Sequence, residues 1–517
     1  MKLLDCTLRD GGYYTNWDFD PDLVQNYFES FNKLPIEYLE IGYRSNPMNS
    51  YLGEYFYCPP HVLEKCKESS NKKLVIILNE KDVRAEHVPQ LLTPCKGYID
   101  MVRIAIDPKN FKRALLLAEA VKKEGFQVGF NVMYMSNWAD EKEFLAQIKN
   151  VDGIADYFYM VDSFGGVYPE DVRNTFNIVR DQTDVEIGFH GHNNLQMALI
   201  NTLTAIECGV SIVDATVTGM GRGAGNLSTE LLLTTLNSKG LIKDLDFNAL
   251  SKVVDPFSEM QAEYGWGTNL PYMVSGAHSL PQKQVMEWVT KRYYSLNSII
   301  RALSNQSRGI KDNKELKALD FNEVEKYPEA ILIGGGPNAV VHAKGIKEFL
   351  LKNPNMVIIH ASSKNARSYE NLPNEQYFCL VGNEGHRLEQ VFNYNKKING
   401  KCILPPYPRK MGTYIPSALT DCAYELKNVD FTDKFEDSHT AIALQTAFEL
   451  GVETIYFTGY DGYEGDAIDK KEQELFLENE YLFKNFKVKK PVSLVSITSS
   501  LYEGLEEDSV YSKIERK

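Results

Sequence analysis

Residues Met101–Met133, MVRIAIDPKNFKRALLLAEAVKKEGFQVGFNVM, contain the pattern that decides the fold of the first half of the chain. Two apolar runs, Met101–Ile106 and Val128–Met133, have the length of buried strands. Between them, Phe111–Gly125 carries apolar residues at helical spacing, lysines on the opposite face and a glycine at its end. This stretch therefore predicts a strand, a helix and a second strand.

The same alternation runs from residue 1 to about residue 235. Eight strands are predicted, at Lys2–Cys6, Tyr38–Gly42, Leu74–Leu78, Met101–Ile106, Val128–Met133, Tyr157–Val161, Glu186–Phe189 and Ile212–Thr216. Eight strands separated by seven helices indicate a parallel sheet of the α/β class, and this length fits a closed (β/α)8 barrel, or TIM barrel. An open doubly wound sheet is the alternative, because the alternation alone does not establish closure.

We predict four segments along the chain. Residues 1–235 form the TIM barrel, residues 236–310 a helical extension that completes its site, residues 311–326 a polar linker, and residues 327–517 a Rossmann-like α/β domain. Residues 228–310 lack strand-like runs, which favours helices there. In the last segment the predicted strands are Ala330–Gly336, Met356–Ala361, Tyr377–Val381 and Thr454–Thr458.

The composition excludes several classes of function. A length of 517 residues suits two or three domains, and a net charge of −14 argues against a nucleic-acid partner. No segment is apolar for long enough to cross a bilayer, and the charged N-terminus does not resemble a signal peptide. The 8 cysteines are scattered without a C-x-x-C pair, which favours reduced thiols. We therefore expect a cytoplasmic protein.

Three polar segments are predicted to meet at the mouth of the barrel. TLRDG (Thr7–Gly11) follows the first strand, HGHNN (His190–Asn194) the seventh, and GMGRGAGN (Gly219–Asn226) the eighth. The C-terminal ends of barrel strands converge, and the first, seventh and eighth strands are neighbours in a closed ring. Each segment alone has an ordinary explanation as a turn, a polar strand end or a flexible loop. Their joint occurrence favours a functional site.

The residue types in these segments suit a metal ion. His190 and His192 are two positions apart, so in a strand both imidazoles face the same side. Asp10 adds a carboxylate from the neighbouring segment. Two imidazoles and one carboxylate, with open positions for substrate, suit Mn²⁺ or Mg²⁺ first, and Zn²⁺ or Fe²⁺ as alternatives.

The motifs DCTLRDGG and GFHGHNN, together with the glycine loop, resemble those of the DRE-TIM metallolyase superfamily over about residues 1–280. That superfamily includes HMG-CoA lyase, isopropylmalate synthase and 4-hydroxy-2-oxovalerate aldolase. The resemblance implies that Asp10, His190 and His192 are metal ligands, with Asn226 as a further candidate. It also implies that Arg9 steadies the enolate of a 2-oxo acid.

Within the superfamily, the aldolase branch is the most similar. Tyr272–His278, YMVSGAH, resembles the Tyr-(five residues)-His segment of those aldolases, whose tyrosine reaches the active site. Where they carry a histidine after the Arg-Asp-Gly motif, this chain has Tyr13, and a phenol is a poor base at neutral pH unless a cation lowers its pKa. The proton carrier is therefore open between Tyr13, Tyr272, His278 and metal-bound water, with an aromatic wall as the other role for Tyr13.

The expected activity is that of a divalent-metal-dependent aldolase, a carbon–carbon lyase that joins or cleaves pyruvate and an aldehyde. The product of addition is a 4-hydroxy-2-oxo acid. Further residues are expected to line the substrate site, although hydrogen bonding inside the barrel is an equal alternative for the first of them: Glu40, Arg44, Asp162 and Ser163. Barrels of this type often dimerise, so a homodimer is expected.

Two competing functions are considered. One is a Claisen-type enzyme of the same superfamily that uses an acyl-CoA. Such members usually carry Glu-Gln after the Arg-Asp-Gly motif, whereas Gly12 and Tyr13 follow here. The other is a non-catalytic metabolite-binding scaffold, which would have no need for all four of the residues Arg9, Asp10, His190 and His192.

A second glycine-rich turn, ILIGGGPNAV, lies in the last segment. A glycine turn between a strand and a helix suits an anion, but the G-x-G-x-x-G pattern of dinucleotide sites is absent. With TGYDG further on, the segment weakly resembles pterin pyrophosphokinase-like domains and sialyltransferases that use nucleotide sugars. A pocket for a nucleotide or a phosphorylated sugar is predicted at Gly334, Gly336, Asn338 and Asp461, with Asp437 and His439 as further candidates.

The alternative for this segment is a non-catalytic partner domain. The fusion itself suggests the hypothesis that the second domain acts on the aldolase's partner molecule. A sugar aldehyde extended by pyruvate would then give a sugar acid for a surface polysaccharide.

Overall fold

The computed structural model describes residues 1–49, 51–290, 294–310, 313–320, 322, 324–394, 398–409, 413–463 and 470–515. Contacts divide the chain into two compact units, Met1–Glu287 and Trp288–Lys517. This division differs from the predicted one, because residues 288–326 belong to the second unit. There Asn313 donates to the carbonyl of Arg409 at 2.6 Å and Leu319 joins the core. Residues 311, 312, 321 and 323 of the predicted linker lie outside the described residues.

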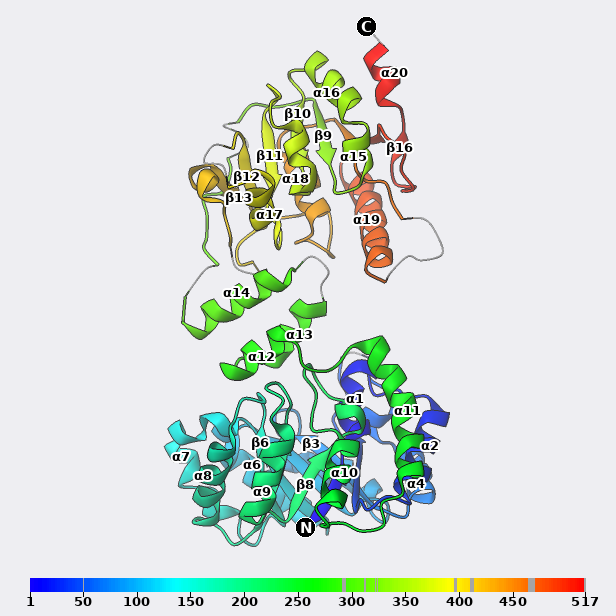
Figure 1. Cartoon of the computed structure of the whole chain (residues 1–517), viewed down its shortest axis with the longest axis vertical. Coiled ribbons are helices and arrows are strands. Elements are labelled where there is room, and N and C mark those ends of the chain that lie inside the picture. The colour runs from blue at the N-terminus through cyan, green and yellow to red at the C-terminus, as the bar shows by residue number, and fades with distance from the viewer. Residues whose placement is uncertain are drawn as a thin grey trace. The chain divides into compact units, whose positions relative to one another are not determined.

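The first unit contains a closed barrel of eight parallel strands, β1 to β8 in chain order (Figure 1). Their bounds are β1 Lys2–Asp5, β2 Tyr38–Tyr43, β3 Lys73–Asn79, β4 Met101–Ile106, β5 Gln127–Val132, β6 Tyr157–Asp162, β7 Glu186–Gly191 and β8 Ile212–Ala215. Because β1 pairs with both β2 and β8, the ring is closed. The predicted TIM barrel is confirmed, and the open sheet is excluded.

Helices surround the barrel because each has one apolar face. In α6 (Phe111–Lys123), for example, Ala114, Leu117 and Val121 are buried and the lysines end the helix. The other helices up to β8 are α1 Thr7–Thr15, α2 Pro21–Phe31, α3 Glu54–Tyr57, α4 Pro60–Ser69, α5 Val88–Leu92, α7 Lys142–Leu145, α8 Pro169–Arg180 and α9 Ala198–Cys208. After β8, the helices predicted for residues 228–310 are α10 Thr229–Ser238, α11 Phe247–Tyr264, α12 Leu270–Ala277, α13 Gln282–Thr290 and α14 Leu296–Ser307.

The second unit is built on a parallel sheet with the order β13-β12-β11-β10-β9-β14-β15-β16. The strands are β9 Glu329–Ile333, β10 Val357–His360, β11 Gln376–Cys379, β12 Lys401–Leu404, β13 Ala423–Glu425, β14 Thr454–Thr458, β15 Ser493–Ser496 and β16 Glu506–Glu507. The predicted α/β domain is confirmed. Four strands (β12, β13, β15 and β16) were not predicted, because none of them contains more than three consecutive apolar residues.

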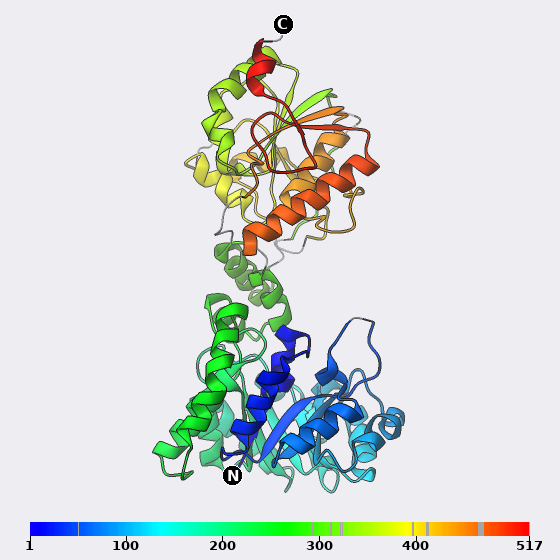
Figure 2. The ribbon, with the colours of Figure 1, turned by 90° about the vertical axis from the view of Figure 1, so that its right-hand side faces the viewer.

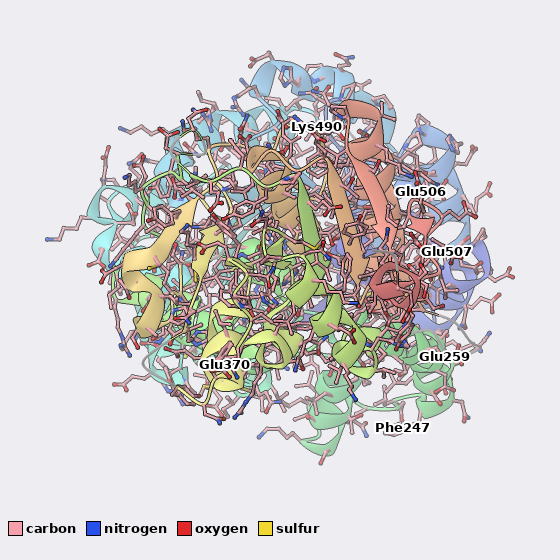
Figure 3. All side chains as sticks on the ribbon, turned by 90° about the horizontal axis from the view of Figure 1, so that it is seen from above. Phe247, Glu259, Glu370, Lys490, Glu506 and Glu507 are labelled. Atoms are coloured by element: carbon pink, nitrogen blue, oxygen red, sulfur yellow. The ribbon has the colours of Figure 1, made fainter. Side chains whose placement is uncertain are left out.

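Helices cover both faces of this sheet, and Figure 2 shows the longest of them, α19 (Lys470–Lys489), in orange. The others are α15 Asn338–Val341, α16 Ala343–Lys352, α17 Glu384–Val391, α18 His439–Glu449 and α20 Val510–Glu515. The last strand, β16, consists of two exposed glutamates, labelled in Figure 3. Charged side chains on an edge strand oppose pairing with another chain, so this edge of the sheet is protected.

Two further findings concern the thiols and the helices. All eight cysteines lie among the described residues and are free. Within the described residues, no helix has the length and apolar character needed to span a membrane.

Candidate active site

Asp10 lies on a helix that follows the first strand without a loop. β1 ends at Asp5 and α1 begins at Thr7, so the TLRDG segment is helical and is not the turn considered from the sequence. Two glycines allow close packing around this helix. A Cβ at Gly12 would lie 2.2 Å from the Trp17 ring, and one at Gly11 would lie 2.6 Å from Met220 Sδ of the glycine loop. Helix α1 and the glycine loop are therefore held together.

The three predicted metal ligands come together at this point. His190 lies near the end of β7, and its ring centre is 5.0 Å from that of His192. His190 Nε2 is 4.0 Å from Asp10 Oδ2. Asp10 and His190 are buried, and His192 is half-buried.

Hydrogen bonds fix the orientation of both imidazoles. His190 Nδ1 is 2.9 Å from Asp214 Oδ2, and His192 Nδ1 is 2.7 Å from the carbonyl of Asp162. A carbonyl or carboxylate partner assigns the proton to Nδ1, which leaves the Nε2 lone pair for another ligand. Burial lowers the pKa of both histidines, that of His190 well below its usual range, so both are neutral near pH 7. A neutral imidazole of fixed orientation is the form that binds a metal ion.

Asn226 supplies a test of whether these residues fit a cation. Its Nδ2 donates to Asp10 Oδ2 at 2.7 Å and to the carbonyl of Met220 at 3.3 Å. Its Oδ1 is buried and has no hydrogen-bond partner among the described residues. Burial raises the pKa of Asp10, but Arg9, the two imidazoles and Asn226 outweigh burial and lower it, so Asp10 is a carboxylate. Two oxygen donors and two neutral imidazoles form a donor set that fits a divalent ion.

A second group of potential ligands overlaps this one. Cys6, His190 and Asp214 have donor atoms within 4.8 Å of one another. Burial raises the pKa of the Cys6 thiol well above its usual range, so it is protonated. Asp214 is already paired with Arg103 and with His190 Nδ1. The structure therefore favours Asp10, His190 and His192, with Asp214 as the residue that orients His190.

A chain of buried charges underlies the site. Arg9 forms ion pairs with Asp10 and, through Nε at 2.7 Å, with Glu40. Arg103, which is fully buried, connects Glu40 at 3.2 Å to Asp214 at 2.5 Å. Glu40 is thus bonded inside the barrel, the alternative considered from the sequence. Sequence reasoning missed Arg103 and Asp214, although a charge in the middle of an apolar strand was a usable signal.

Tyr13 lies beside the ligand group, between two residues that were not predicted. Its hydroxyl is 3.1 Å from that of Tyr43, the last residue of β2. The guanidinium carbon of Arg222, from the glycine loop, lies 4.0 Å from the centre of the Tyr13 ring. Tyr43 and Arg222 both interact electrostatically with Asp10, so these side chains place two hydroxyls and one cation near the predicted metal ligands.

The structure does not bring every predicted residue to this group. Tyr272 packs against Gly223 beneath the glycine loop, and burial raises its pKa to about 12. His278 is exposed at the C-terminal end of α12. The donors of Arg44 are bonded to backbone carbonyls of Tyr57, Cys58 and Leu91. Among the described residues, neither His278 nor Arg44 forms a hydrogen bond with the ligand group.

Asp162 and Ser163 hold the loop that follows β6. Asp162 Oδ1 accepts from the amide of Gly166 at 3.2 Å, and Ser163 Oγ accepts from the amide of Tyr134 at 2.9 Å. Burial raises the pKa of Asp162 to about 7. Asp162 thus acts on the site through its carbonyl, which orients His192.

In the second unit, backbone amides of the predicted glycine turn are already hydrogen-bonded to other residues of the chain. The amide of Gly336 donates to the carbonyl of Gly459 at 2.8 Å, and the amide of Asn338 donates to Asp461 Oδ2 at 2.9 Å. The four predicted pocket residues therefore do lie together. However, a carboxylate stands at the start of α15, where a phosphate was expected, and it opposes a second anion there.

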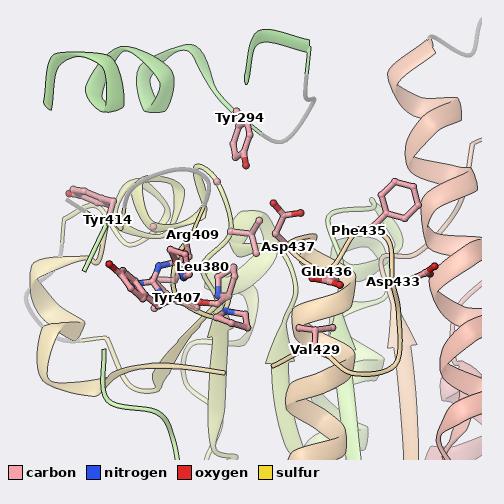
Figure 4. Close-up of a pocket in the computed structure, with 17 residues that line it drawn as sticks. Tyr294, Leu380, Tyr407, Arg409, Tyr414, Val429, Asp433, Phe435, Glu436 and Asp437 are labelled. Atoms are coloured by element: carbon pink, nitrogen blue, oxygen red, sulfur yellow. Dashed lines mark hydrogen bonds between the residues drawn. The ribbon is translucent and has the colours of Figure 1, made fainter. Parts of the chain in front are cut away.

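A cavity of about 350 Å³ lies elsewhere in the second unit (Figure 4). It opens beyond the carboxyl ends of β11 and β12, on the edge of the sheet where parallel sheets bind ligands, although the strand order reverses between β9 and β14. Tyr407, Tyr414 and Arg409 lie on one side, and three acidic residues, Asp433, Glu436 and Asp437, on the other. Asp437 is thus the one predicted pocket residue in this lining. The barrel site remains the stronger candidate for catalysis, because its titratable groups are buried and mutually oriented.

Comparisons with known proteins concern the barrel. Residues 100–256 match the HMGL-like family. The crystal structure of the N-terminal domain of a candidate aldolase from Bacteroides vulgatus is 55% identical, covers 58% of this chain and 100% of its own, and has a TM-score of 0.56. An oxaloacetate decarboxylase from Mycobacterium tuberculosis is 28% identical over 292 residues, 55% of this chain and 84% of that protein. A 4-hydroxy-2-oxovalerate aldolase from Bacillus cereus is 27% identical over 259 residues, 49% of this chain and 75% of that protein.

Proposed function

The chain belongs to the HMGL-like family and is a carbon–carbon lyase, and on this premise we propose that it is a divalent-metal-dependent aldolase acting on pyruvate and an aldehyde. The observation that carries the proposal is the group formed by Asp10, His190 and His192 beside the unpaired Oδ1 of Asn226. Mn²⁺ or Mg²⁺ is the ion expected for this mixture of oxygen and nitrogen donors.

Arg9 has a defined task in this reaction. A divalent ion held by the three ligands would polarise the keto oxygen of pyruvate and make its methyl protons acidic. Arg9 is buried, and its hydrogen bonds to Asp10 and Glu40 use Nη1 and Nε. Among the described residues Nη2 has no hydrogen-bond partner, so it can donate to the negative charge that develops on the substrate. Although burial lowers the pKa of Arg9, the two carboxylates raise it further, so the charge persists at every working pH.

Tyr13 is the proposed proton carrier for the aldehyde oxygen. A phenol is a weak base but an adequate acid towards an alkoxide, which is the charge that aldol addition creates. The hydroxyl of Tyr43 and the guanidinium of Arg222 stabilise the phenolate that remains after the transfer. The buried Tyr272 and the exposed His278 are less suited to this task.

Decarboxylation of oxaloacetate is the second candidate function. The relative from Mycobacterium tuberculosis carries that name, and the reaction releases the same pyruvate enolate without an aldehyde. The ligand group and Arg9 serve both reactions equally. The identity of the electrophile, a proton or an aldehyde, therefore separates the two.

One experiment tests the proposal and its alternative together. The protein is supplied with Mn²⁺ in D2O, and exchange of the pyruvate methyl protons is followed by NMR, beside cleavage of 4-hydroxy-2-oxopentanoate and decarboxylation of oxaloacetate. The aldolase predicts metal-dependent exchange and cleavage that EDTA and His190→Gln both abolish. The exposed His61 provides the matched control, His61→Gln, which should retain both activities. Exchange with decarboxylation but without cleavage would identify the decarboxylase, and absence of exchange would reject pyruvate chemistry.

For the second unit, a nucleotide or a phosphorylated sugar stays the hypothesis, and its proposed place moves from the glycine turn to the cavity beyond β11 and β12. The cavity size lies within the range of small-molecule sites, which supports this placement. The three carboxylates of its lining suit the sugar hydroxyls of such a ligand, and its phosphate would have to lie away from them. The role in making a surface polysaccharide, the homodimer and the cytoplasmic location remain predictions.

A further inference from the structure

Arg222 is a cation that the pyruvate half of the reaction does not use. It stands between Gly221 and Gly223 in the loop after β8, and its side chain is half-buried. A Cβ at Gly223 would lie 3.0 Å from the Tyr272 ring, so the loop lies close to α12 on this side. Its guanidinium faces the Tyr13 ring at 4.0 Å. None of the ion pairs among the described residues includes Arg222, whereas Arg9 and Arg103 are both paired with carboxylates.

Arg222 has no carboxylate partner among the described residues. Arg9 and Arg103 pair with three carboxylates, Asp10, Glu40 and Asp214, and none of these five side chains forms an ion pair with Arg222. An unpaired charge in a partly buried site is costly unless a ligand neutralises it.

We propose that Arg222 binds an anionic group on the aldehyde substrate, a carboxylate or a phosphate, beside Tyr13. The inference rests on the proposed aldolase function and adds the substrate class. A guanidinium presents parallel N–H donors that match either anion. The hydroxyls of Tyr13 and Tyr43 lie next to it and can donate to the same group or to the aldehyde oxygen.

The position of Arg222 assigns it to the aldehyde and not to pyruvate. Pyruvate is expected at the metal ligands, where Arg9 donates. Arg222 covers the Tyr13 ring, and Tyr13 is the residue proposed to protonate the aldehyde oxygen. An anionic tail held by Arg222 would therefore bring the aldehyde carbonyl to Tyr13. The competing role is purely structural, with Arg222 stacking on Tyr13 to hold the ring in place.

Matched aldehydes separate these roles. Addition to pyruvate is measured with Mn²⁺ for succinic semialdehyde against butanal, and for glyceraldehyde 3-phosphate against glyceraldehyde. Wild type should prefer the anionic member of at least one pair, and the pair with the larger preference identifies carboxylate or phosphate. In Arg222→Met, kcat/KM should fall for both aldehydes, because Arg222 also stabilises the Tyr13 phenolate, and the loss should be about 10- to 100-fold larger for the anionic aldehyde than for the neutral one. Arg222→Lys should keep part of the preference for the anionic aldehyde, because lysine retains the positive charge but lacks the paired N–H donors of a guanidinium.

A binding measurement gives a readout without turnover. Succinic semialdehyde and glyceraldehyde 3-phosphate are titrated calorimetrically into protein that holds Mn²⁺ and oxalate, a pyruvate mimic without methyl protons. Arg222→Met should weaken the binding of the preferred anion at least about tenfold. Arg173→Met is the matched control, since Arg173 pairs with Glu207 on an exposed surface. Circular dichroism and Tm establish that each variant is folded.

Each remaining outcome overturns the inference. Equal losses for anionic and neutral aldehydes in Arg222→Met would assign the arginine a structural role. A wild-type enzyme that uses both members of each pair equally well would also reject anion recognition, while exchange of the pyruvate methyl protons still supported the aldolase. If wild type shows no exchange at all, the proposed function fails first and the inference fails with it.

Discussion

Two glycine-rich turns follow strands in this chain, one after β8 and one after β9, and the side chains around them differ in kind. The first turn lies beside two neutral imidazoles, the Asp10 carboxylate and Oδ1 of Asn226, which has no hydrogen-bond partner among the described residues. Together these groups attract a cation. Around the second, Asp461 accepts the amide at the start of α15 and Asn365 donates to the carbonyls of Gly334 and Gly336. Glycine thus permits a close approach in both turns, but the charge brought there by distant residues decides what can bind.

The largest expected effect tests the barrel turn. Asp10→Asn removes the anionic ligand and should lower kcat/KM for metal-dependent cleavage on the order of 10³-fold, because metal ligation supplies several kcal/mol of charge stabilisation. Steady-state kinetics with matched Mn²⁺ concentrations measures the loss. The same change in the other turn, Asp461→Asn, should leave cleavage unchanged. A similar loss in both variants would show that the comparison is wrong and that the two turns serve one reaction.

The next effect is a dependence of stability on pH. The buried carboxylate of Asp162 binds a loop amide in the first unit, as Asp461 binds a turn amide in the second. Burial raises the pKa of Asp162 from 3.8 to about 7. Between these values the unfolded chain ionises first, so stability should fall as pH rises from about 4 to about 7 and then level off. A rise of about three pKa units corresponds to about 4 kcal/mol at most.

Asp162→Asn removes this dependence, because the amide does not ionise. Urea unfolding of the metal-free protein at pH 5 and pH 8 compares the two proteins, and wild type should lose stability relative to the variant at the higher pH. Parallel stability curves would mean that Asp162 titrates at its ordinary value in the folded state.

A smaller effect is expected when the support of one ligand is removed. Asp214→Asn leaves His190 in place but weakens the bond to its Nδ1, and such partners typically contribute 10- to 100-fold to metal affinity. Titration with Mn²⁺ should show a loss in this range. Glu186 is exposed at the start of β7, the strand that carries His190, and the control variant Glu186→Gln should bind Mn²⁺ normally. If Asp214→Asn binds Mn²⁺ with unaltered affinity, Asp214 does not support a metal ligand. The group of Cys6, His190 and Asp214 would then have a purely structural role.

The smallest expected effect concerns the glycine turn after β9. Asp461→Ala removes the acceptor for the Asn338 amide, as the loss of a helix cap does, and should cost about 1 kcal/mol locally. Hydrogen exchange of the peptides around residues 334–345 should become faster, while Asp461→Asn, which keeps an oxygen acceptor, should change it less. Slower exchange in Asp461→Ala on addition of inorganic phosphate would indicate that the carboxylate alone keeps an anion out.

Much of the barrel and part of its site could be predicted from local pattern. Strand ends are correct within two residues, because β4 or β6 is an apolar run bounded by polar residues, and the order of the motifs places Asp10, His190 and His192 at one mouth. The partners could not be predicted. Asp214 and Arg103 lie inside predicted strands, and nothing in the sequence indicates that they pair with each other. Arg222 belongs to a glycine-rich loop, and its contact with Tyr13 is apparent only in the structure. The short strands β12, β13, β15 and β16 were missed because none of them contains more than three consecutive apolar residues.

The sequence by itself determined the alternation of strands and helices and the residue types suited to a metal ion, because these depend on local periodicity and on the convergence of strand ends. The closure of the ring was decided by the pairing of β1 with β8, which the sequence pattern does not contain. Only the tertiary structure decided which nitrogen of each histidine is free, that the second glycine turn is closed by Asp461, and that Arg222 covers Tyr13. These features depend on pairs of residues far apart in the chain. Whether such a pair attracts a ligand or satisfies itself follows from distances that only folding sets.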